Sequence, residues 1–169
     1  VVTDKGEYKF DYMVNDTDVH YFYSNLLKDQ KLLKKQLKPE KSSSAVIFFW
    51  GVMNRFPDLK LHNILFSGDY RSEFHHLFGK KMIYRDPTVY IFISSKAIAQ
   101  DAPFGSENWY VMINAPENTG QNWSKIIKQA RKNIVLKINR MLDINIERFI
   151  AYERVMYPGT IEENTSSWH

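Results

Sequence analysis

Two stretches of the chain are apolar at successive positions instead of alternate ones. The first runs through Ala45–Trp50 within residues 42–52, and the second through Trp109–Ile113 within residues 101–116. Strands that are buried on both faces have this apolar, β-branched and aromatic character, and turn-forming residues bound both stretches. We therefore expect two paired central strands in a sheet whose faces are covered by protein on one side and by protein or an apolar ligand on the other. Gly51 predicts a bulge or a close backbone approach at the end of the first strand.

Shorter patterns predict the elements around these two strands. Apolar residues at helical spacing predict helices over residues 19–37 and 122–142, and the second helix has one apolar stripe suited to lying on a sheet. Further strands are expected at residues 8–14, 61–66, 89–94 and 151–156, a short helix at 71–78, a helical turn at 145–149, and a β-hairpin within residues 1–10. Strands and helices mix without strict alternation, so the sequence predicts an α+β fold with a mixed, largely antiparallel β-sheet covered by helices.

Composition adds one positive signal. A chain of 169 residues is expected to form a single domain, and its aromatic share of 15% is high. Aromatic side chains fill cores, and they also line pockets for flat apolar ligands. The net charge of +4 permits anionic partners without arguing for them. Lysines gather between residues 28 and 41, where they form either a solvated face or a contact with an anionic membrane surface.

The sequence lacks the signals that are typical of several kinds of chemistry. The chain has no cysteine, and its five histidines do not show the spacing of metal ligands. It contains no glycine-rich phosphate loop and no nucleophile elbow. The lysines and the aromatic residues occupy different segments, which argues against a nucleic-acid partner. The residues alone therefore predict a domain that forms an apolar pocket. The start at Val1 without an initiator Met suggests a piece excised from a longer protein.

An ordered set of short motifs gives a more specific indication of function than composition does. It comprises VNDTD (14–18), SSSAVIFFWGV (42–52), HNILFSGDY (62–70), DPTVYI (86–91), APFG (102–105) and ERV (153–155). In this order and spacing the set resembles the middle of the bacterial-type phytoene desaturases, over nearly the whole chain. Carotenoid isomerases, other carotenoid oxidases and retinol saturases share the pattern.

The resemblance implies an FAD-dependent oxidoreductase of the amine-oxidase-like superfamily. It places the flavin-binding segments outside this chain and makes residues 1–169 largely the substrate domain, with residues 1–18 as a linking strand from the FAD-binding domain. The intact enzyme would introduce double bonds into a C30 or C40 polyene in carotenoid biosynthesis, as a cytoplasmic protein associated peripherally with a membrane. The isolated piece is expected to bind no flavin and to show no turnover.

Within that family, the sheet would form one wall of an apolar tunnel for the polyene. We expect Phe48, Trp50, Asn63, Trp109 and Asn114 to contact the substrate. Because side chains alternate along a strand, only one of Phe48 and Phe49, and one of Trp109 and Tyr110, can face the tunnel. Core packing is the default interpretation for the aromatic residues, and a bond to the backbone is the alternative for the two asparagines.

No catalytic residue is assigned, since Glu107 and Asp101 are only weak candidates for acid–base chemistry. Two other functions stay open. One is isomerisation or saturation of a polyene by an enzyme of the same family, and the other is a non-catalytic domain that binds an apolar ligand.

Overall fold

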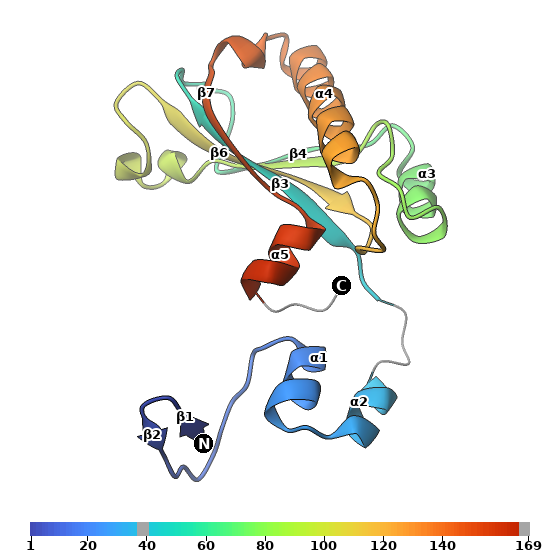
Figure 1. Cartoon of the computed structure of the whole chain (residues 1–169). Helices are drawn as coiled ribbons and strands as arrows, with labels where there is room; N and C mark the ends of the chain where they lie inside the picture. The colour runs from blue at the N-terminus through green and yellow to red at the C-terminus, as the bar shows by residue number, and fades with distance from the viewer. Residues whose placement is uncertain (37–40, 166–169) are drawn as a thin grey trace. The chain divides into compact units, whose positions relative to one another are not determined.

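The computed structural model describes residues 1–36 and 41–165, which form two compact units (Figure 1). The first unit comprises residues 1–36 and the second comprises residues 41–165. That the whole chain is one domain cut from a longer protein, with residues 1–18 as its linking strand, stays a prediction.

The first unit begins with the expected hairpin, in which β1 (Val2–Thr3) pairs antiparallel with β2 (Gly6–Glu7). The prediction of a further strand over residues 8–14 is wrong, because these residues have no regular structure. Their alternating apolar side chains bury nothing: Tyr12 and Val14 are 93% and 97% exposed. An alternating pattern makes a strand only where a partner strand or a packed face receives it.

The single helix predicted over residues 19–37 is divided into α1 (Val19–Tyr21), the π-helical turn η1 (Phe22–Leu26) and α2 (Gln30–Gln36), and residue 37 lies outside the described residues. The Asp18 carboxylate caps α1 by accepting two backbone N–H bonds. Lys28 then adopts a left-handed φ of +55°, and the Asp29 carboxylate accepts two backbone N–H bonds at the start of α2. A second capping residue inside the predicted helix therefore divides it.

The second unit is built on an antiparallel sheet of five strands in the order β4-β5-β6-β3-β7 (Figure 1). The strands are β3 (Ser44–Val52), β4 (His62–Leu65), β5 (Val89–Phe92), β6 (Glu107–Ala115) and β7 (Ile150–Met156). The two expected central strands are neighbours and pair along all nine residues of each, from Ser44 opposite Ala115 to Val52 opposite Glu107. The α+β fold is confirmed, and every pair in this described sheet is antiparallel.

Helices and turns join these strands. They are α3 (Tyr70–Phe74), the π-helical turn η2 (His75–Gly79), the 3-10 turns η3 (Ser94–Lys96), η4 (Ala99–Asp101) and η5 (Ile146–Arg148), and the helices α4 (Trp123–Leu142) and α5 (Pro158–Thr165). The long predicted helix is confirmed as α4, which Asn122 caps by accepting the Lys125 N–H. The helix α5, which no sequence pattern predicted, starts at Pro158, as a proline in the first helical turn allows.

The core lies between α4 and one face of the sheet. Alternate residues of the central strands, among them Phe48 on β3 and Val111 on β6, are fully buried against Ile134 and Ile138 of the helix. Each large side chain buried in this way stabilises the fold by about 1.5–3 kcal/mol.

A buried lysine fastens α4 to the edge of the sheet. Lys137 is 3% exposed, and its ammonium donates to the carbonyl oxygens of Phe66 at 3.0 Å and Pro87 at 2.6 Å. It also pairs with Asp86 at 2.9 Å. Burial by itself raises the pKa of the Asp86 carboxyl, but the Gly68 N–H and Lys137 outweigh it and hold the pKa below its usual value. The ends of β4 and β5 are thus held against the helix by one charge.

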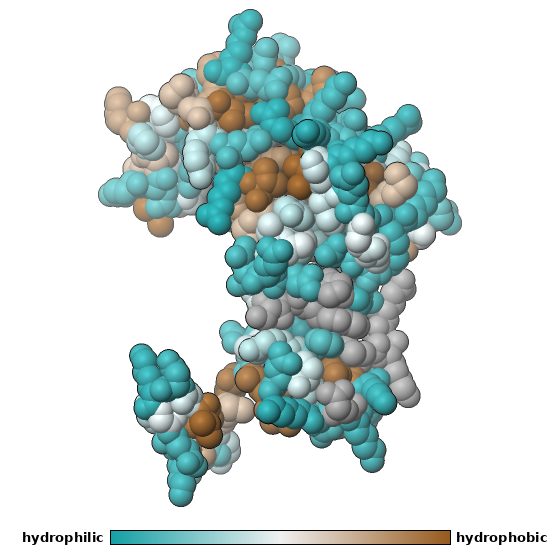
Figure 2. All heavy atoms as spheres, viewed as in Figure 1, coloured by the Kyte–Doolittle hydropathy of each residue, from teal (hydrophilic) through white to brown (hydrophobic). Residues whose placement is uncertain are grey.

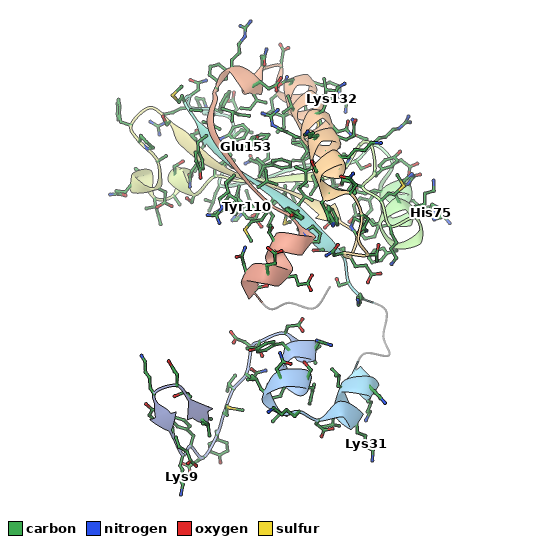
Figure 3. All side chains as sticks on the ribbon, viewed as in Figure 1. Lys9, Lys31, His75, Tyr110, Lys132 and Glu153 are labelled. Atoms are coloured by element: carbon green, nitrogen blue, oxygen red, sulfur yellow. The ribbon has the colours of Figure 1, made fainter. Side chains whose placement is uncertain are left out.

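Replacing Lys137 with Met is expected to lower the free energy of unfolding by about 2–4 kcal/mol, since two buried carbonyl groups and a carboxylate lose their partner. Urea denaturation followed by circular dichroism measures the loss. The matched control is Lys132→Met, an exposed lysine on the same helix (labelled in Figure 3), which should change stability by no more than about 0.5 kcal/mol. Equal losses for the two variants would contradict the role given to Lys137.

Candidate functional site

The face of the sheet opposite α4 carries a second set of apolar side chains, which we call the open face. Because alternate residues of a strand point to opposite faces, these are the neighbours of the core residues. The open face includes His62 and Ile64 on β4, Tyr90 and Phe92 on β5, Tyr110 and Met112 on β6, Ile47 and Phe49 on β3, and Tyr152 on β7. Phe49, Phe92 and Tyr110 remain only half-buried, although they lie in the middle of the sheet.

The rings of the open face contact one another across four strands. The Phe49 and Tyr110 rings meet edge to face with centroids 5.5 Å apart, and the Tyr90 and Tyr110 rings do so at 6.3 Å. His62 stacks on Phe92 at 5.2 Å, and its Nδ1 lies 2.8 Å from the Tyr90 hydroxyl. Such edge-to-face and stacked pairs each add about 0.5–1.5 kcal/mol beyond the area they bury. The result is a continuous aromatic floor whose rings hold one another in place.

A pocket of about 710 Å³ lies over part of this floor. Its lining from the sheet includes Phe49, Phe92, Tyr110 and Tyr152, and the loop between β5 and β6 (residues 93–106) adds Ala102, Pro103 and Ser106. The volume is within the range of small-molecule sites, and most of the lining is apolar. On the side of the molecule shown in Figure 2, by contrast with this apolar lining, hydrophilic side chains predominate.

Gly51 shapes this pocket where β3 meets β7. A Cβ atom at Gly51 would lie 3.2 Å from the Cβ atom of Tyr152, which is closer than most Cβ contacts in proteins. The β3–β7 register also shifts between Gly51 and Val52. Both the close approach and the bulge that the sequence predicted are present.

Three of the predicted substrate contacts lie on the helix-covered face instead. Phe48, Trp50 and Trp109 are 0%, 2% and 1% exposed. The indole N–H groups of both tryptophans are bonded to carboxylates, Trp50 to Glu153 at 2.7 Å and Trp109 to Glu107 at 2.9 Å. Their role in substrate binding stays a prediction, and the two tryptophans still contribute atoms to the pocket lining.

The structure decides which member of each neighbouring pair faces outward. Phe49 and Tyr110, rather than Phe48 and Trp109, occupy the open face. The sequence showed that one of each pair would do so, but nothing in the residue types distinguished them. Tyr110, on β6, is labelled in Figure 3.

The two predicted asparagines have different surroundings. The Asn63 amide bonds to the backbone of Lys60 and, at 3.2 Å, to the carbonyl oxygen of Ile91, which matches the alternative that it bonds to the backbone. Asn114 lies on the open side of β6, two residues beyond Met112. Neither asparagine lines the pocket over the open face.

The two carboxylates considered for acid–base chemistry also differ. Glu107 is 2% exposed and pairs with Lys96 at 2.6 Å, while its oxygens accept the Phe56 N–H and the Trp109 indole N–H. A carboxylate bonded on both oxygens holds loops together. Asp101 is exposed at the pocket rim. Within residues 1–36 and 41–165, no cluster of three or more His, Asp or Glu side chains is arranged to hold a metal ion.

Comparison with known proteins shows which proteins this chain is similar to. No protein-family model matches the chain. It is 51% identical over 168 residues to a 1-hydroxycarotenoid 3,4-desaturase of Flavobacterium sp. (strain P99-3), covering 99% of this chain and 34% of that protein. The homologues of this chain are carotenoid desaturases.

Two more distant relatives agree. A 4,4'-diaponeurosporene oxygenase of Staphylococcus aureus (strain bovine RF122 / ET3-1) is 30% identical over 97% of the chain, and a phytoene desaturase of Fusarium fujikuroi is 23% identical over 96%. The chain spans about a third of the length of these curated relatives. The carotenoid-desaturase resemblance that the motifs indicated is therefore confirmed, and the chain corresponds to one segment of such an oxidoreductase.

Substitutions at neighbouring positions of β3 are expected to lower the free energy of unfolding by different amounts, because the two side chains lie on opposite faces of the sheet. Phe48→Ala opens a cavity in the core and is expected to lower the free energy of unfolding by about 3–5 kcal/mol. Phe49→Ala removes a half-buried ring and should cost about 1 kcal/mol, mostly its edge contact with Tyr110. Urea denaturation of the two variants measures the difference. A larger loss for Phe49→Ala would mean that the open face is covered.

Proposed function

We propose that this chain is the substrate-binding segment of an FAD-dependent carotenoid desaturase, and that its open face is one wall of the polyene site. The observation that carries the proposal is the 51% identity to a carotenoid desaturase over 99% of the chain. The pocket over the aromatic floor supports it, since a long conjugated chain is apolar and flat.

This segment would position the polyene and would not itself react with it. FAD, bound by the intact enzyme, would supply the hydride acceptor for an allylic C–H of the polyene. The rings of Phe49, Tyr90, Phe92 and Tyr110 would hold the polyene in one plane and exclude water from it. Gly105 and Gly120 have positive φ but stand alone in separate turns, so the described residues offer no glycine-rich cradle for a dinucleotide. We therefore assign FAD binding to the rest of the enzyme.

The substrate we propose is an acyclic carotenoid that carries a hydroxyl near one end. The relative at 51% identity is named for a 1-hydroxycarotenoid, whereas the phytoene desaturase is only 23% identical. Phytoene or a C30 polyene is the second candidate.

We also propose that the intact enzyme binds a membrane surface, where such a polyene dissolves. The β5–β6 loop, which lines the pocket, carries a fully exposed Phe104 and an Ile98 that is 54% exposed. None of the helices in the described ranges is long and apolar enough to cross a bilayer. Shallow insertion of this loop would bring the pocket against the lipid.

The function is tested with the full-length gene in two hosts, one that accumulates phytoene and one that accumulates a 1-hydroxylated acyclic carotenoid. Extracted pigments are separated and their absorption spectra recorded. We expect a product with a longer conjugated system in the second host. Unchanged carotenoids from a protein that nevertheless binds flavin would favour isomerisation or saturation. A protein that binds a polyene without flavin and leaves it unchanged would favour the non-catalytic domain that binds an apolar ligand.

Membrane binding is tested with a double variant of the full-length protein, Ile98→Ser with Phe104→Ser. Sedimentation with phosphatidylglycerol vesicles should show binding at least about 10-fold weaker, because two large apolar side chains no longer leave water. Phe66→Ser is the matched control, since Phe66 is 64% exposed but follows β4 at the opposite end of the sheet. An equal effect of the two changes would contradict the role of the loop.

A further inference from the structure

Tyr110 stands out among the polar groups of the pocket. It lies on the central strand β6, its ring is fixed between Phe49 and Tyr90, and it forms part of the pocket lining. The hydroxyl is therefore carried on a ring that its neighbours orient, inside a site that is otherwise mostly apolar.

The Tyr110 hydroxyl makes a poor hydrogen bond within the protein. It donates to the Met112 sulfur at 3.5 Å, and a thioether is a weak acceptor. Burial, and next the charge of Tyr90, raise the pKa of Tyr110 above its usual value of 10.0, so the phenol keeps its proton at neutral pH. The hydroxyl can therefore donate to, and accept from, an oxygen atom of a ligand.

Two residues near Tyr110, Tyr90 and Asn108, already have hydrogen-bond partners. The Tyr90 hydroxyl lies 2.8 Å from His62 Nδ1. The Asn108 amide accepts the Ser95 N–H at 3.0 Å and donates to the Ser94 hydroxyl at 2.7 Å. Each of these partners would have to be given up before the group could bond a ligand, whereas Tyr110 gives up only a weak sulfur contact.

We infer that Tyr110 determines substrate specificity, by hydrogen bonding the hydroxyl group at the end of an otherwise apolar polyene. This inference rests on the proposed function. A hydroxyl that enters an apolar pocket loses its water partners and needs a replacement. Tyr110 supplies one, so a hydroxylated polyene binds with its polar end at Tyr110 and its conjugated chain along the aromatic floor.

The position fits a recognition role better than a chemical one. No carboxylate or histidine bonds the Tyr110 hydroxyl among the described residues, so nothing there accepts its proton. The loss of this contact should consequently appear in substrate binding, as a higher KM with an unchanged kcat.

The test compares two polyenes that differ by one hydroxyl group, a 1-hydroxylated acyclic carotenoid and its parent hydrocarbon, on the full-length enzyme with its flavin. Tyr110→Phe keeps the ring and removes only the hydroxyl. We expect kcat/KM for the hydroxylated polyene to fall by about 3- to 10-fold, with the value for the parent unchanged. Tyr84→Phe is the matched control, because Tyr84 packs on His76 and does not line this pocket.

Other outcomes overturn the inference. Equal losses on both polyenes would mean that Tyr110 acts through packing, and no loss on either would mean that its hydroxyl touches no substrate. If the unaltered enzyme converts both polyenes equally well, the proposed function stands and only the inference fails. If it neither binds nor converts a polyene, the proposed function fails and the inference fails with it.

Discussion

The structure of residues 41–165 depends on the pairing of β3 with β6. The two strands are antiparallel over nine residues, and both present apolar side chains to both faces. A pair of this kind must be covered on both sides, because neither face can be left to water without cost. The helix α4 covers one face with a continuous apolar stripe. The other face is left as a floor of half-buried rings.

Buried charges fix the two ends of this arrangement. At one end, Lys137 joins α4 to the chain around Asp86 and Pro87. At the other, Glu107 joins Lys96 to the backbone of Phe56. Each of these groups is fully used by partners in the protein, so they hold loops in place and are not free for acid–base chemistry. The Lys96–Glu107 pair lies at the end of the sheet where the β5–β6 loop contributes to the pocket lining.

A rigid aromatic floor suits the proposed task in a carotenoid desaturase. The polyene carries few polar atoms, so its orientation depends on shape and on the rare hydrogen bond at its ends. Phe49 and Phe92 offer shape, whereas Tyr110 offers shape and a hydroxyl with spare hydrogen-bonding capacity. In the proposed function a flavin would supply the reacting group, and this segment would supply the binding surface.

The sequence alone determined the central strand pair, the long helix α4, the bulge at Gly51 and the resemblance to carotenoid desaturases. These follow from local signals, namely continuous apolar runs, helical spacing, a glycine in a strand and an ordered set of motifs. It could not show that Asp29 begins a new helix, or that residues 8–14 find no partner strand, because both depend on what the rest of the chain places beside them. Nor could it show which face α4 would cover. Phe48 and Phe49 are the same residue type on opposite faces, so only the packing of the helix decided that Phe48 is core and that Phe49, with Tyr110, faces the pocket.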